Sequence, residues 1–325
     1  MSATPRGSTA YAQVMSHITF IHGIANKPPE DRLLASWERA IAAQSGINLG
    51  AEGVTTSMVY WADIMYGAPK DEAGFESLEA AGHDFERNDD IDLSFIADTK
   101  GDEAEFVNKL STRLNFEADV DEEETPPEGA AGVEYERIPL PGWLKKRIMK
   151  AFLRDVHHYL YNSANTPRPG ETYQVQDEIR SRLTGKLMDG AEAAGDEPHV
   201  IVAHSMGTVM AYDCLKRHGD VPRVDGLLTM GSPLGLDEIQ DAFAPEWSRS
   251  DGFPSEKLKG AWYNVFDRLD PVAGLDPDLA NDYKRQSLVV VNDLSASNGG
   301  AWRHSVSKYL GRPKLRQALS EMLDL

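Results

Sequence analysis

One stretch, residues 199–219, places the strongest constraint on the fold of this chain of 325 residues. Its first part, HVIVAH, is an apolar run typical of a buried strand, and the residues after Ser205 have the spacing of an amphipathic helix. Ser205 therefore lies at a tight strand-to-helix turn, which needs small neighbours, and Ala203 and Gly207 supply them. The pattern predicts a nucleophile elbow. The alternative is a buried serine that caps the helix following it.

Short apolar runs rich in Val, Ile and Leu recur along the chain, and longer segments with helical spacing follow them. The runs lack strict alternation, which indicates burial on both faces, as in a parallel sheet with crossover helices. We therefore predict an α/β fold with a mostly parallel sheet of about six strands flanked by helices. The predicted strands are residues 17–22, 55–61, 199–204, 225–230, 262–266 and 287–291.

The charge of the chain is concentrated in one region. There are 33 Lys and Arg against 52 Asp and Glu, and a net charge of −19 argues against a nucleic-acid partner. Residues 71–136 hold 22 acidic and 4 basic residues, whereas the rest of the chain, with 30 acidic and 29 basic residues, is nearly balanced. We predict a disordered tail over 1–15, a core made of 16–63 and 166–325, and an acidic, largely helical cap inserted over 64–165.

Residues 143–160 predict an amphipathic helix with a basic side. Apolar residues recur every four positions from Leu144 to Leu160, and Lys and Arg lie between them. Such a helix can lie on a membrane surface. We expect it instead to pack on its own domain, with the acidic region balancing its charge. A second insertion, 237–259, carries three aromatic residues and forms either part of a lid or a surface loop that these aromatics anchor.

The cysteine content and the length of the apolar runs indicate in which cellular compartment the protein is expected. Cys214 is the only cysteine, so no internal disulfide can form, and nothing resembles a cysteine-based zinc site. No run is apolar enough for a signal peptide or a membrane span. We therefore expect a cytoplasmic protein.

A serine nucleophile needs a histidine base that a carboxylate holds in one tautomer. In the α/β-hydrolase superfamily, which the elbow AHSMG resembles, that histidine follows the last strand. Of the 9 histidines, only His304 follows the last predicted strand. His204 adjoins Ser205, and we expect its side chain to point away from the elbow and to pack or hydrogen-bond beneath it. His157 and His158 are adjacent, so they face different directions and make a poor metal pair. His304 is therefore the predicted base.

The segment after the predicted strand 262–266 offers three acids, Asp267, Asp270 and Asp276. With a serine elbow before them and a histidine after them, the chain resembles the α/β-hydrolase superfamily. The elbow AHSMG is similar to that of small bacterial lipases, which also begins with alanine. The resemblance implies a reduced sheet, whose first strand corresponds to the third of the family and which lacks the two leading antiparallel strands.

The resemblance also implies roles for further residues. The acid of the family lies a few residues past its seventh strand, often before a pair such as Pro-Val, which matches Asp270 and leaves Asp267 in reserve. Its oxyanion hole uses the backbone N–H of the residue after the nucleophile, here Met206, and one in the loop after its third strand, here Ile24 in FIHGIA. The GSPLG sequence at 231–235 would line the acyl side of the cleft.

These residues predict a serine hydrolase of carboxylic esters, an esterase or lipase. His304 takes the proton of Ser205 as the hydroxyl attacks an acyl carbon, and an acyl-enzyme forms without a cofactor or metal. The expected partner is a small-molecule or lipid ester. The alternatives are a phospholipase whose helix 143–160 contacts lipid, a thioesterase or acyltransferase, and a weakly active protein of this fold that senses a ligand or binds a partner.

Overall fold

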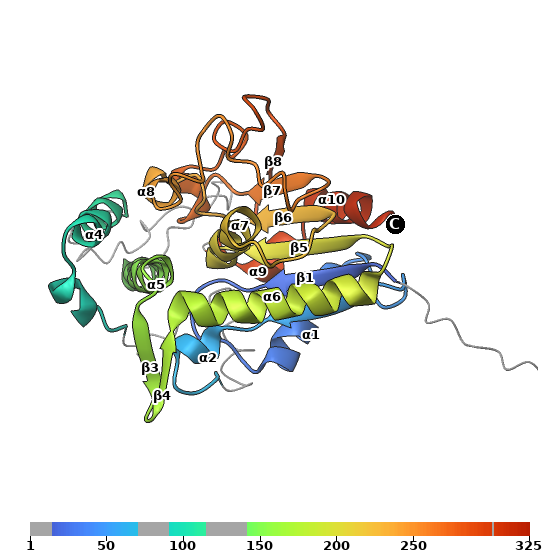
Figure 1. The fold of residues 1–325 in the computed structure, drawn as a ribbon. Coiled ribbons are helices and arrows are strands. Elements are labelled where there is room, and N and C mark those ends of the chain that lie inside the picture. Colours follow the sequence, from blue (N-terminus) through green and yellow to red (C-terminus); the bar gives the residue numbers. More distant parts are fainter. Residues whose placement is uncertain (1–14, 71–90, 115–141, 301) are drawn as a thin grey trace, which may run out of the picture.

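A computed structural model of the protein describes residues 15–70, 91–114, 142–300 and 302–325. Its centre is a six-stranded sheet in which every neighbouring pair of strands is parallel (Figure 1). The order across the sheet is β2-β1-β5-β6-β7-β8, and the strands are β1 His17–Ile21, β2 Thr55–Val59, β5 His199–His204, β6 Gly226–Met230, β7 Trp262–Phe266 and β8 Val291–Ser295. The predicted α/β fold with a parallel sheet flanked by helices is thus confirmed.

Helices cover both faces of the sheet (Figure 1). Alternate residues of a strand point to opposite faces, so Val200 and Val202 of β5 lie in one hydrophobic core, and Ile201 and Ala203 lie in the other. The helices that contribute to the first core are α1 Glu30–Ala42, α9 Val306–Leu310 and α10 Pro313–Leu323. The second core includes side chains of α5 Gly142–Leu160, α6 Val175–Ala194 and α7 Met206–Arg217, together with shorter helices described below. Burial on both faces explains the continuous apolar runs.

The prediction of a last strand at 287–291 is wrong, because β8 begins only at Val291. Leu288 and Val289 are 67% and 65% exposed and lie before the strand, where Leu288 forms an isolated bridge with Arg285. β8 is an edge strand that pairs with β7 alone, so its residues do not need the apolar character of a central strand. The other five strands lie within two residues of the predicted ranges.

The described elements between β2 and α6 lie outside the six-stranded sheet. They are α2 Ala62–Met65, the 3-10 helix η1 Ser94–Asp98, α4 Asp102–Arg113, α5 and the antiparallel hairpin of β3 Ala164–Arg168 and β4 Glu171–Gln174. The helix predicted at 143–160 is confirmed as α5, and its side chains Ile148, Phe152 and Val156 are fully buried. The hairpin was not predicted, because its side chains are polar and largely exposed.

Some predictions fall outside the described residues. Residues 1–14 of the predicted tail and much of the acidic stretch 71–136 lie there. In the part of the chain that the structure does describe, no helix is long and apolar enough to cross a membrane.

The second insertion, 237–259, is attached to the core by aromatic side chains. It contains the short helix α8 Asp237–Asp241. Phe243 and Phe253 are buried, and they pack against Tyr212 and Trp262, with ring centroids 5.0 and 6.2 Å apart, respectively. The segment is therefore anchored as the surface-loop alternative expects.

Two buried histidines face each other where β1 and β5 begin. The ring of His17 hydrogen-bonds the hydroxyls of Thr55 and Ser57 at 2.7 and 2.9 Å, and that of His199 bonds the hydroxyl of Thr19 at 2.9 Å. The two ring centroids are 5.3 Å apart. Burial lowers the pKa of each imidazole to about 4, so both rings are neutral at pH 7.

This pair predicts that the protein loses stability in mild acid. An unfolded histidine titrates near its ordinary pKa of about 6.5, so between that pH and about 4 the unfolded chain binds more protons than the folded one. The contribution of the two histidines to the free energy of unfolding should therefore be complete above about pH 6.5, and it should decrease as the pH falls below that value. Urea titrations at pH 7.5 and 5 check this, with His199→Gln expected to reduce the difference between the two midpoints. Equal midpoints for the unmodified protein would contradict the prediction.

Candidate active site

Ser205 lies at the turn between β5 and α7. Its φ of 52° and ψ of −124° place it in a region that non-glycine residues rarely adopt, and the residue is fully buried. Its backbone N–H donates to the carbonyl of Met230 at the end of the neighbouring strand β6, at 3.0 Å. The strained turn projects the hydroxyl from the carboxyl end of the sheet, which is where parallel α/β sheets bind ligands.

The structure brings Ser205, Asp270 and His304 together from three separate loops. The hydroxyl of Ser205 lies 2.8 Å from Nε2 of His304, and Nδ1 of His304 lies 2.8 and 2.9 Å from the two carboxylate oxygens of Asp270. The carboxylate can only accept, so Nδ1 carries the proton and Nε2 is left to accept from Ser205. All three side chains are buried. This is the hydrogen-bonded chain that the activation of a serine requires.

Asp270 is stabilised as an anion by its surroundings. Its Oδ1 accepts the backbone N–H groups of Val272 and Ala273 at 2.8 and 3.1 Å, and its Oδ2 accepts the hydroxyl of Tyr309 at 2.6 Å. Burial alone would raise the pKa of Asp270, but the imidazole of His304 and these hydrogen bonds hold it below its ordinary value. Asp270 is thus ionised and oriented at neutral pH.

Asp267, the reserve acid, has a different partner. Its Oδ2 accepts Nη1 of Arg303 at 3.0 Å and the backbone N–H of Asn298 at 2.6 Å, while its Oδ1 accepts the N–H of Leu269 at 2.9 Å. The ion pair is buried, and Arg303 directly precedes His304 in the chain. Asp267 therefore connects the end of β7 to the loop that carries the imidazole of His304.

The loop after β1 packs directly against Ser205, as the predicted oxyanion position of Ile24 requires. β1 and β5 are neighbours in register, with Ile21 opposite Ala203. The fit is so close that a Cβ on Gly23 would lie 2.7 Å from the Cβ of Ser205. Ile24 and the helix residue Met206 are both buried beside the serine.

His22 holds this loop in place through its hydrogen bonds. Its Nδ1–H donates to the carbonyl of Gly23 at 2.8 Å, and its Nε2 accepts the backbone N–H of Trp61 at 3.0 Å. The indole of Trp61 stacks on the imidazole at 4.7 Å and donates to the carbonyl of His22 at 2.9 Å. Burial and the nearby charge of Lys27 lower the pKa of His22 to about 3, so the ring stays neutral.

His204 lies beneath the elbow and hydrogen-bonds there, as expected from the sequence. Its Nε2–H donates to the backbone carbonyl of His304 at 3.0 Å, and the two ring centroids are 4.7 Å apart. Burial keeps the pKa of His204 well below its ordinary value. A neutral imidazole therefore positions the backbone of the predicted base.

Helix α5 contributes a buried ion pair next to the loop after β1. Nε of Arg154 donates to Oδ1 of Asp155 at 2.8 Å, and the pair is nearly inaccessible to solvent. Burial raises the pKa of Asp155, although Arg154, Lys27 and the backbone N–H of Ala25 favour its ionised form. Ala25 itself has a φ of 74°, a conformation that its neighbours must maintain. The inserted segment thus contacts the loop that carries Ile24.

Gly207 offers a steric test of the close packing between α7 and β1. A Cβ at Gly207 would lie 2.6 Å from the carbonyl oxygen of Ile21 and 2.7 Å from that of His22, and backbone atoms cannot move aside as a side chain can. We expect Gly207→Ala to cost about 2 kcal/mol of unfolding free energy, because it pushes β1 away from α7. The matched control is Gly185→Ala on α6, where a Cβ meets no atom within 4 Å. Calorimetry should find Gly207→Ala less stable than Gly185→Ala, and equal melting temperatures would refute the close approach.

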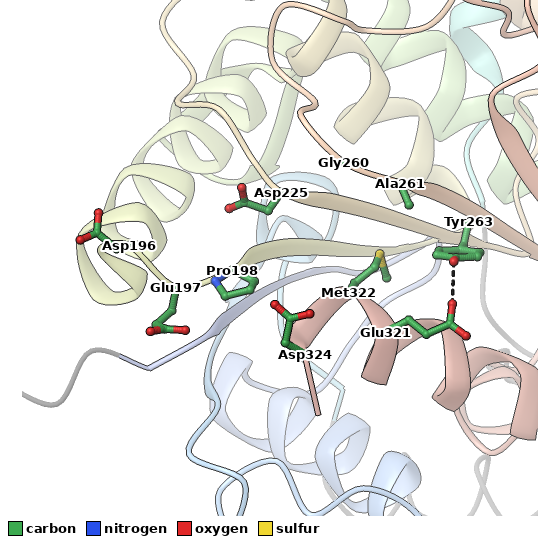
Figure 2. Close-up of a pocket in the computed structure, with 10 residues that line it drawn as sticks. All are labelled: Asp196, Glu197, Pro198, Asp225, Gly260, Ala261, Tyr263, Glu321, Met322 and Asp324. Carbon is green, nitrogen blue, oxygen red and sulfur yellow. Dashed lines mark hydrogen bonds between the residues drawn. The ribbon is translucent and has the colours of Figure 1, made fainter.

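A pocket of about 440 Å³ lies at the amino ends of the strands, where β5, β6 and β7 begin (Figure 2). Its lining is acidic and includes Asp196, Glu197, Asp225, Glu321 and Asp324. Because Ser205 lies at the carboxyl ends of the strands, this pocket is not part of the site described above.

The structure assembles residues that sequence reasoning did not identify. Tyr309 and Trp61 were missed, because an isolated aromatic residue in a helix or at a strand end carries no pattern that distinguishes it from core. No group of three or more His, Cys, Asp or Glu side chains in the described residues could hold a metal ion. No protein-family model matches the chain, and no curated protein matches it.

Proposed function

We propose that the protein is a serine hydrolase of the α/β-hydrolase type that cleaves carboxylic esters. The observation that carries the proposal is the imidazole of His304, which lies 2.8 Å from both the hydroxyl of Ser205 and the carboxylate of Asp270. An imidazole hydrogen-bonded on both sides in this way is an oriented general base. The order of the three residues along the chain, serine, aspartate, histidine, is that of the α/β-hydrolase family.

The strand order supports this assignment. The order β2-β1-β5-β6-β7-β8 is that of a hydrolase sheet without its two leading antiparallel strands. Ser205 follows β5, Asp270 follows β7 and His304 follows β8, so each residue occupies the place that the family gives to its nucleophile, acid and base.

In the proposed reaction, the Ser205 oxygen attacks the carbonyl carbon of the ester while Nε2 of His304 takes its proton. The negative oxygen of the tetrahedral intermediate accepts the backbone N–H groups of Ile24 and Met206. The bond to the alcohol oxygen then breaks, and His304 gives the proton to the leaving alcohol. A water molecule attacks the acyl-enzyme, again losing a proton to His304, and the acid leaves as Ser205 regains that proton. Asp270 stabilises the imidazolium in both steps.

The proposal includes a cap over the site, and helix α5 is the described part of the inserted segment that contributes to it. Two observations support it: Ser205 is fully buried, and Asp155 of the inserted helix α5 contacts the loop that carries Ile24. A substrate must then displace part of the covering structure to reach the serine. Small esters and lipid esters are both within the proposed class. The fully buried side chains of α5 belong to the protein core and do not form a surface for lipid.

Labelling with a fluorophosphonate tests the proposal directly. The reagent should phosphonylate the unmodified protein and the control Ser36→Ala, which removes another buried serine, but not Ser205→Ala. Because Ser205 is buried, a small sulfonyl fluoride should be used beside the larger probe. Mass spectrometry would locate the adduct. Absence of serine-dependent labelling by both reagents would reject an enzyme and favour the ligand-sensing alternative.

A panel of p-nitrophenyl esters and thioesters of increasing chain length would then define the substrate. A rate that rises sharply above the solubility limit of the ester would indicate a lipase, whereas a rate that saturates below this limit would indicate an esterase for soluble substrates.

A further inference from the structure

Tyr309 is the one side chain besides His304 whose hydrogen bond to the carboxylate of Asp270 is described in the structure. It lies on the short helix α9, which follows His304 directly, and its ring is fully buried. Its hydroxyl donates to Oδ2 of Asp270 at 2.6 Å and accepts the backbone N–H of Asp267 at 3.1 Å. One hydroxyl therefore contacts two residues at the start of the loop that follows β7.

The hydroxyl of Tyr309 competes with the imidazole for the same oxygen. Nδ1 of His304 is 2.8 Å from Oδ2 of Asp270, the atom that Tyr309 also contacts. A strong donor withdraws charge from a carboxylate, which weakens both its hydrogen bond to a second donor and its attraction for a nearby cation. Burial and the adjacent Asp270 hold the pKa of Tyr309 well above its ordinary value, so the phenol remains a donor.

We propose that Tyr309 is a positioning residue that acts through Asp270: it orients the carboxylate towards His304 and lowers the pH below which the site loses activity. The catalytic part of this inference rests on the proposed function. Tyr309 does not reach the Ser205 hydroxyl in this arrangement, and its effect on the reaction passes through the carboxylate.

The substitution Tyr309→Phe tests the proposal, because it removes the hydroxyl and keeps the ring. Without the competing donor, Asp270 attracts the imidazolium more strongly. The acid limb of the pH profile of kcat/KM should then move to higher pH by about half a unit. The plateau of kcat should fall by roughly tenfold, because the carboxylate has lost one of the groups that orient it.

Tyr159→Phe is the matched control. The hydroxyl of Tyr159 also donates to a buried carboxylate, Oδ2 of Asp213 at 2.8 Å, but that carboxylate binds Arg180 and belongs to the packing of α5, α6 and α7. We expect Tyr159→Phe to lower stability without moving the acid limb. An acid limb that is unchanged in Tyr309→Phe, or that moves equally in both variants, would overturn the proposal.

A second measurement does not depend on activity. The Nδ1 proton of His304 should give a low-field proton resonance, assigned by its loss in His304→Ala. In Tyr309→Phe this resonance should move further downfield, because Asp270 becomes a stronger acceptor. An unchanged resonance would overturn the proposal even if no ester is hydrolysed. Absence of hydrolysis by the unmodified protein, with the resonance shifted as expected, would instead reject the proposed function and leave the role of Tyr309 at Asp270 supported.

Discussion

Replacement of Ser205 or His304 by alanine is expected to lower kcat for the proposed ester hydrolysis by about six orders of magnitude, as for the paired serine and histidine of a characterised serine hydrolase. The two side chains act as one unit, since the hydroxyl is a poor nucleophile unless the imidazole, 2.8 Å away, removes its proton. For the same reason the double variant should be about as slow as either single variant. Steady-state kinetics with a p-nitrophenyl ester would measure all three.

These losses should not reflect unfolding. Ser205→Ala removes one hydroxyl and leaves the packing of β5 and α7 in place, so its melting temperature should stay close to that of the unmodified protein. Ser36→Ala, a buried serine on α1, is expected to keep full activity. If Ser205→Ala retained more than about a hundredth of the rate, a nucleophile other than Ser205 would be acting.

Asp270→Asn is expected to lower kcat by about four orders of magnitude while keeping the shape of the site. The amide of asparagine can donate as well as accept, so it no longer requires the proton of His304 to lie on Nδ1. In the wrong tautomer Nε2 carries a proton and cannot accept from Ser205. The fall in kcat should therefore be largest near neutral pH, which a pH profile of the variant would measure.

Asp267→Asn separates the two acids. Asp267 forms a buried ion pair with Arg303, and its replacement by a neutral amide removes the carboxylate charge from that pair. The expected cost is about 3 kcal/mol of unfolding free energy, with a smaller effect on kcat than that of Asp270→Asn. If Asp267→Asn lowered kcat more than Asp270→Asn while remaining folded, Asp267 would be the acid of the site.

Local features of the chain were sufficient to predict much of the fold. A strand buried on both faces must be apolar along its whole length, so β1, β5 and β7 could be located from runs of residues alone. The edge strand β8 is not under this constraint, and the apolar run before it, at 287–291, was mistaken for the strand. The tight strand-to-helix turn at Ser205 was also recognisable, because the strand, serine and helix are continuous in sequence.

The order of residues along the chain predicted more of the site than local sequence patterns did. His304 was selected because it alone follows the last predicted strand, and Asp270 because the resemblance to α/β-hydrolases places the acid before Pro-Val. The structure brings both to Ser205, at hydrogen-bonding distances that no sequence pattern could supply. The choice between Asp270 and Asp267 needed the structure, since it depends on which carboxylate faces the imidazole and which faces Arg303.

The sequence by itself determined the parallel sheet, the strand-to-helix turn at Ser205 and the order of the candidate residues along the chain, because these depend on short-range pattern and on chain order. Only the tertiary structure decided what surrounds them: Tyr309 on Asp270, His204 on the backbone of His304, and Trp61 on the loop after β1. Each of these contacts joins segments tens of residues apart in the chain. A hydrogen bond depends on the positions of two groups in space, which the packing of helices on the sheet establishes.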